Sequence, residues 1–288
     1  MTKPNGPTNE HYIPTWLTDR WRTENSDPKK KRGMVGFYDL SVEPVCYKEI
    51  PIRSVNDVEN GLAENGPLHS YRKLGEEPLG NKLDVEFTKW ENRAKKVLEE
   101  RVDCLSHPGG WLGVPLSDAE CVSLVMFLQG LKVRQPEQAR PFVEAFFDTH
   151  RGIEKGEIAT IKAEDGRFEF NGILYDFTST GESLLLGHRS VIYLNNLDRL
   201  GGELYLMPTE PTKLLLVVGR SEGLWERVCS SLSVLPPKVL AVSVNEMILE
   251  ANQKAERLKR VYYKNDEDHD GFIKDWVKNG NNGMSPIT

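Results

Sequence analysis

The spacing of apolar residues along this chain changes twice, and that change limits most strongly what the chain can fold into. Over residues 84–150, apolar positions recur every three or four residues, which predicts helices. Over residues 158–218 they alternate or form short runs, as in strands, and after residue 221 the helical spacing returns. This order predicts an α+β fold, in which a helical layer packs on a central, mainly antiparallel sheet.

The same pattern predicts one domain between two tails. Residues 11–263 contain the predicted helices and strands, with the sheet at about 158–218. Residues 1–10 are rich in Pro, Asn, Gly and Thr and predict a flexible tail. Residues 264–288 predict a second tail, which is first acidic and then rich in Gly and Asn.

Helix-forming segments lie on both sides of the predicted sheet. They are residues 11–21, 84–103, 117–135, 137–150, 221–232 and a last helix from residue 243. Two helices are predicted to begin at an S-x-x-E capping box, in which a serine hydroxyl and a glutamate satisfy free backbone N–H groups. The boxes are Ser117 with Glu120 and Ser243 with Glu246. Pro136 predicts the end of the 117–135 helix, because a proline disfavours helical angles in the residue before it.

The predicted strands are short, and those at 158–163, 167–170 and 173–177 alternate in polarity. They are residues 34–40, 158–163, 167–170, 173–177, 190–194, 202–207 and 214–218. Asn171-Gly172 separates two of them and predicts a tight hairpin turn.

The charge of the chain limits its partners. Lys and Arg together number 37 and Asp and Glu 43, for a net charge of −6, which argues against a protein that covers nucleic acid or an anionic membrane with its whole surface. One basic run, Lys29, Lys30, Lys31 and Arg32, predicts a phosphate-binding loop or a nuclear import signal. The alternative is an exposed loop. Nucleic acid is therefore expected as a partner only through such a local patch.

No segment predicts insertion into a membrane. The longest apolar stretches, residues 124–128 and 214–218, are much shorter than the roughly 18–20 residues that a spanning helix needs. Residues 1–10 lack the apolar core of a secretory signal. The four cysteines are scattered and form no CxxC pair, which predicts a reduced, cytoplasmic protein.

Residues 266–277 contain the best match to a metal-binding pattern. Asp266, Asp268, Asp270 and Gly271 fit D-x-D-x-D-G, whose carboxylates converge on Ca²⁺ in a loop. The twelfth position, where a bidentate Glu is expected, is Val277. The sequence therefore predicts at most a weak calcium site, and the alternative is a solvated acidic run. No other cofactor is evident.

No catalytic sequence signature is present. The chain lacks HExxH, GxSxG, Walker A and GxGxxG motifs. Its six histidines are dispersed, without the helical spacing of a metal-binding pair. Residues 107–110 read His-Pro-Gly-Gly and could hold the backbone close to a ligand, but a loop that links helices explains them equally well. Residues 179–183, rich in Ser, Thr and Gly, could present hydroxyls but are typical of a plain turn.

Several short motifs together resemble a known family. They are His11-Tyr12-Ile13-Pro14, Trp90-Glu91, Phe127-Leu128-Gln129, Arg134-Gln135-Pro136, Pro208-Thr209-Glu210-Pro211, Val244-Asn245-Glu246 and Ala255-Glu256-Arg257. In this order they resemble a widespread bacterial family known only as domain of unknown function 4238, over about residues 11–263. Its members often carry a Ser-Asp-x-Pro turn in the sheet region, where residues 187–191 here read Gly-His-Arg-Ser-Val. The family has no established activity, so the resemblance implies an architecture more than a mechanism.

The resemblance draws attention to five polar residues. His11 can act as an acid or base, Arg134 offers a planar fork to phosphate or carboxylate, and Glu91 could orient either. Gln129 and Asn245 supply amides for ligand binding, alongside the basic run. If the five converge, they form a pocket for a phosphate-bearing ligand or a nucleic-acid end. The alternative is a buried hydrogen-bond network that fixes helix packing.

Two classes of function remain. The first is a binding or regulatory protein with a protein partner, in a bacterial defence or toxin–antitoxin setting. The second is a hydrolase or nuclease-like effector that uses His11 and Arg134 on a phosphate-bearing substrate. An enzyme requires an accessible cleft around these residues. An interaction protein is expected to show an exposed apolar patch and a closed polar network.

Overall fold

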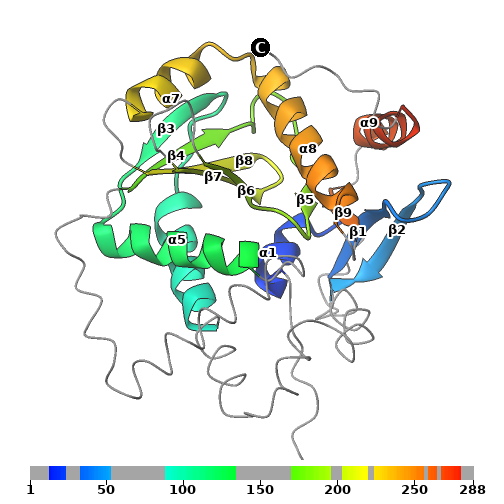
Figure 1. Ribbon diagram of the computed structural model, residues 1–288, viewed down its shortest axis with the longest axis horizontal. Coiled ribbons are helices and arrows are strands. Elements are labelled where there is room, and N and C mark those ends of the chain that lie inside the picture. Colours follow the sequence, from blue (N-terminus) through cyan, green and yellow to red (C-terminus); the bar gives the residue numbers. More distant parts are fainter. Residues whose placement is uncertain are drawn as a thin grey trace, which may run out of the picture.

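The computed structural model describes residues 13–23, 33–52, 88–133, 170–195, 203–219, 224–255, 259–264 and 267–279. Its helices and two antiparallel sheets confirm the α+β fold (Figure 1). The helices are α1 (Thr15–Thr18), the 3-10 helix η1 (Asp19–Trp21), a helix over 88–97 that continues into the π-helix η2 (Leu98–Val102), α5 (Asp118–Val133), α7 (Leu224–Ser233), α8 (Pro237–Gln253) and α9 (Glu267–Lys278). The predicted helix at 137–150 and the predicted strands at 158–163 and 167–169 lie outside the described residues.

The larger sheet contains five strands, all antiparallel to their neighbours. In spatial order they are β3 (Gly110–Val114), β4 (Phe170–Asp176), β8 (Lys213–Gly219), β7 (Glu203–Glu210) and β6 (Ile192–Asn195). β8 is central and is buried along nearly its whole length. Burial on both faces explains why its sequence is a continuous apolar run instead of an alternating one.

Helices α5 and α8 cover opposite faces of this sheet (Figure 1). Successive side chains of a strand point to opposite faces, and β8 follows this rule. Leu215 and Val217 pack on the side of α5, whereas Leu214 and Leu216 pack on the side of α8. The sheet therefore separates two cores, one under each helix.

The Asn171-Gly172 turn predicted from the sequence is wrong. Both residues lie inside β4, where they pair with Val218 and Val217 of β8. The side chain of Leu116 lies 2.9 Å from where a Cβ of Gly172 would be, so the glycine makes room for a neighbouring side chain. An Asn-Gly pair favours a turn locally, but here neighbouring strands supply its backbone with partners.

The start of α5 confirms the capping box at Ser117. The backbone N–H of Ser117 donates to the Glu120 carboxylate at 2.8 Å, and the backbone N–H of Glu120 reaches Ser117 Oγ at 3.4 Å. The Glu120 carboxylate also bonds Arg101 at 2.7 Å. Hydrogen bonds from Ser117 and Arg101 hold the pKa of Glu120 at about 2. The local pattern therefore predicted this helix start correctly.

The second predicted capping box, at Ser243, is wrong. Helix α8 begins at Pro237, after Pro236, so Ser243 lies in its interior. Proline suits the first helical position because its missing N–H would have no partner there. The extra turns at the start bury Leu240 and Ala241 against the sheet, and this packing favours the longer helix.

A second, smaller sheet joins the two ends of the described chain. In spatial order its strands are β2 (Tyr47–Pro51), β1 (Met34–Asp39), β9 (Arg260–Tyr263) and β5 (Leu186–Gly187), all antiparallel. The sequence predicted β1 but not β2, β5 or β9, which are short. The prediction of one central sheet at about 158–218 therefore missed this second sheet.

Gly187 in β5 leaves no room for a side chain. A Cβ there would lie 2.0 Å from Nδ2 of Asn252, whose buried amide is held by the backbone of Arg189 at 3.0 and 3.3 Å. Gly187→Ala is therefore expected to lower the free energy of unfolding by about 2 kcal/mol, measured by urea denaturation. Gly113→Ala is the control, because nothing lies within 4 Å of its Cβ position. Equal losses in both variants would contradict the prediction.

Helices α7 and α8 meet at a bend that carries exposed apolar side chains. Val234 is 77% exposed, and Leu235, Val239 and Met247 are exposed by 38–39%. Among the described residues, no single helix is long and apolar enough to cross a membrane. Residues of α7 and α8 reach that length and composition only when taken together, across a bend of 114°.

Candidate functional site

Gln129 and Asn245 lie on opposite faces of the five-stranded sheet, because α5 and α8 cover different faces (Figure 1). Gln129 Nε2 donates a hydrogen bond to the hydroxyl of Tyr205 in β7. Asn245 is buried in the middle of α8, not in its first turn as predicted. The structure therefore does not bring these two predicted ligand-binding residues together.

The other residues of the predicted pocket are only partly described. Glu91 is half-buried on the helix over 88–97. His11, Arg134 and the basic run Lys29, Lys30, Lys31 and Arg32 lie outside the described residues. The convergence of His11 with Arg134 and Glu91 therefore stays a prediction.

Asn245 and Asn252 fasten α8 to the segment over residues 183–189. Asn245 accepts a hydrogen bond from Leu185 N at 2.8 Å and donates to Ser183 O at 2.9 Å. Asn252 accepts from Arg189 N at 3.0 Å and donates to Arg189 O at 3.3 Å. Each amide thus pairs with the backbone as a neighbouring strand would. For Asn245, this is the buried network that was the alternative to a ligand pocket.

The segment predicted as a calcium-binding loop is a helix, so its predicted loop conformation is wrong. Residues 267–278 form helix α9, in which alternate residues point about 200° apart and do not converge as in a loop. Asp270 accepts a hydrogen bond from Tyr38 and pairs with Lys274 at 2.6 Å. Asp266 and the side chain of Asp268 lie outside the described residues, so calcium binding stays a prediction. In the described ranges, no group of three or more His, Cys, Asp or Glu is placed to hold a metal ion.

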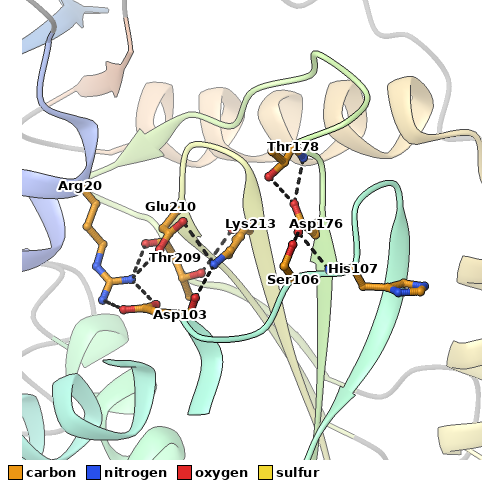
Figure 2. Close-up of polar contacts among 9 residues, drawn as sticks. All are labelled: Arg20, Asp103, Ser106, His107, Asp176, Thr178, Thr209, Glu210 and Lys213. Carbon is orange, nitrogen blue, oxygen red and sulfur yellow. Dashed lines mark hydrogen bonds and ion pairs between the residues drawn. The ribbon is translucent and has the colours of Figure 1, made fainter. Parts of the chain in front are cut away.

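Asp176, at the end of β4, holds together the two loops at residues 106–110 and 178–183, which the sequence analysis considered separately. Its carboxylate accepts hydrogen bonds from Thr178 N at 2.9 Å, His107 N at 3.1 Å and Ser106 Oγ at 3.3 Å, and from Thr178 Oγ1 (Figure 2). Burial alone would raise the pKa of Asp176, but these hydrogen bonds outweigh it and lower the pKa. The His107 ring points away from the carboxylate, so the two form no acid–base pair (Figure 2).

A network of four charges lies beside Asp176 (Figure 2). The Arg20 guanidinium binds both carboxylate oxygens of Asp103, at 2.8 and 2.7 Å, and lies 3.7 Å from Glu210. Lys213 Nζ donates to the Asp103 carbonyl at 3.0 Å and lies 3.6 Å from Glu210. Two positive and two negative groups balance. The network fastens η1 to the β7–β8 hairpin and to the turn after η2, which is a structural role.

A third polar cluster forms a row across the smaller sheet. Asp39 of β1 pairs in register with Arg260 of β9, and His188 N donates to Arg260 O at 3.4 Å. His188 is buried, its ring stacks on Tyr262 and its Nε2 bonds the Tyr262 hydroxyl. Burial, and then the charge of Arg260, lower the pKa of His188 to about 3. The imidazole is therefore neutral near pH 7.

The sequence reasoning missed Asp176, Asn252, Arg260 and His188 as key polar residues. One signal was available for Asn252, because it follows Asn245 by seven positions and so lies on the same helix face. For Arg260 and His188, the partners are distant in the chain, and no local pattern indicates them. For Asp176 the only local signal is Thr178, two residues later, because an Asp side chain often bonds the backbone two residues on.

Comparison with family models, with curated proteins and with solved structures finds no match to this chain.

Proposed function

We propose that this protein is a binding or regulatory component that recognises a protein partner. The observation that supports this most is that the acidic groups near the β7–β8 hairpin are already bonded by other groups of the chain. Asp176 accepts four hydrogen bonds from the chain, and Asp103 and Glu210 are matched by Arg20 and Lys213. A general base must be able to reach a proton of the substrate. Carboxylates saturated by their own fold are poorly suited to that task.

The exposed apolar side chains at the α7–α8 bend also support a binding role. Val239 and Met247 are eight residues apart on α8, which is about 2.2 turns and places them within about 80° of each other around the helix axis. Val234 and Leu235 precede them at the bend. Covering such side chains removes apolar surface from water, which favours association. We call these four residues the bend patch and propose it as the contact surface.

Mutation of the bend patch tests this role. Val239→Glu combined with Met247→Glu is expected to weaken binding of a partner at least about tenfold, because both substitutions place a charge where apolar surface is buried. Val122→Glu is the matched control, since Val122 is 43% exposed on the distant helix α5. The partner is captured by amine cross-linking in bacterial cells and purified. The dissociation constants of the three proteins are then measured.

The location of the cross-links and an activity assay decide between the two classes of function. Cross-links to Lys238 and Lys254, which are exposed at the two ends of α8, support the proposal. Equal affinity of all three proteins would contradict it. Turnover of a phosphodiester such as bis(p-nitrophenyl) phosphate by the purified chain would favour the hydrolase or nuclease class instead.

The remaining expectations are part of the same proposal. We place the protein in the cytoplasm, which agrees with its four free cysteines. The likeness to a bacterial family of unknown function and the defence or toxin–antitoxin setting stay predictions. Nucleic acid would be bound only through the basic run that begins at Lys29.

A further inference from the structure

Arg260, the first residue of β9, carries a buried N–H group without a partner. Its Nη1 atom is buried and makes no hydrogen bond, although the side chain as a whole is 13% exposed. The guanidinium lies over the ring of Phe37, 5.0 Å from its centroid. Buried donors are nearly always satisfied, and a charged donor gains most from an acceptor. The unpaired Nη1 therefore points to an acceptor from outside the protein.

Among the described residues, the neighbours of Arg260 supply no acceptor to Nη1. Asp39 Oδ2 lies 4.0 Å from Nε, which is too long for a hydrogen bond. The other carboxylate oxygen, Oδ1, is bonded by Ser41 N at 3.0 Å and by the Ser41 hydroxyl. The Asp39 carboxylate is thus held by Ser41, and it faces Arg260 only at the Nε edge of the guanidinium.

His188 does not compete with an incoming anion for the Arg260 guanidinium. Its Nε2 is engaged with the Tyr262 hydroxyl, and its ring lies next to Arg260 in the row across the sheet. Two residues after His188, Ser190 is 1% exposed and has a buried hydroxyl without a partner. Arg260 Nη1 and the Ser190 hydroxyl can each donate a hydrogen bond to an oxyanion.

We propose that Arg260 anchors a binding site for a small oxyanion, a phosphate or carboxylate group, at its unpaired Nη1 in the row formed by Asp39, Arg260 and His188. The planar guanidinium donates parallel hydrogen bonds to such groups, which a lysine ammonium cannot do in the same geometry. The site lies on the smaller sheet. It goes beyond the proposed recognition of a protein partner and does not depend on it.

Thermal unfolding of the full chain tests this site. Melting temperatures are compared in phosphate, acetate and chloride at equal ionic strength and pH. The binding anion is expected to raise the Tm of the wild-type protein by on the order of 2 °C over chloride. Whichever of phosphate or acetate gives the rise identifies the group that binds. Arg260→Lys keeps the charge but loses the planar fork, and it is expected to abolish the rise. Arg227→Gln, which removes an exposed arginine of α7, is expected to keep it.

A second measurement covers the case in which Arg260→Lys does not fold. The Nε–Hε resonance of Arg260 in the wild-type protein is expected to shift during titration with the binding anion and to stay unchanged with chloride. An equal Tm rise in all three proteins would mean an adventitious ion only. No rise in any of them would mean that a buried water supplies the acceptor. A resonance that does not move would exclude binding at Arg260. Each of these three results would overturn the proposal.

Discussion

Asp176→Ala is expected to lower the free energy of unfolding by about 3 kcal/mol. Asp176 is 1% exposed, and its carboxylate accepts hydrogen bonds from two backbone N–H groups and two hydroxyls. Removal of the carboxylate leaves these donors without their acceptor and also leaves a small cavity. The loops that begin at Ser106 and Thr178 lose the group that holds them together. Urea denaturation at pH 7 measures the effect.

Two further variants separate the hydrogen bonds from the loss of volume. Asp176→Asn keeps the size of the side chain but turns an amide N–H₂ toward one pair of donors, so it is expected to be destabilised almost as much. Asp275→Ala is the control, because this aspartate is exposed on α9, and it is expected to change stability by less than about 0.5 kcal/mol. A wild-type stability in Asp176→Asn would show that the hydrogen bonds contribute little.

The sequence predicted best those elements whose causes are local. The start of α5 depends on Ser117 and Glu120, which are three residues apart, and the structure confirms it. The S-x-x-E pattern at Ser243 failed because serine and glutamate also occur three apart inside a helix. There, two prolines and the burial of Leu240 decided where α8 begins. Local chemistry fixes a boundary only when packing does not favour another.

The polar clusters could not be predicted because their members are distant in the sequence. Asp176 takes two of its three partner residues, Ser106 and His107, from a different loop. The row across the smaller sheet requires β1 to pair with β9, and β9 with β5. Those strands are so short that alternation hardly distinguishes them from loops. Pairing of this kind is determined by the whole core and not by the spacing of residues within one segment.

Acid is expected to destabilise this protein through His188. The pKa of His188 is about 3 in the folded state because the ring is buried next to Arg260, whereas the ordinary pKa of a histidine is 6.5. Between these values the unfolded chain takes up a proton that the folded chain excludes. The stabilising contribution is therefore complete above pH 6.5 and is lost as the pH falls toward 3. From pH 7 to pH 4 the loss amounts to about 3 kcal/mol.

His188→Gln isolates this contribution from that of the other titrating groups. The Gln amide can still bond the Tyr262 hydroxyl but takes up no proton, so the variant is expected to lose less stability on acidification. The difference in free energy of unfolding between the two proteins should shrink by about 1.4 kcal/mol per pH unit below pH 6. His107→Gln, which changes an exposed histidine, is the control for the loss of a histidine. Parallel pH profiles of wild type and His188→Gln would show that His188 takes up its proton without unfolding. In that case the row beside Arg260 would be open enough to accommodate a second positive charge.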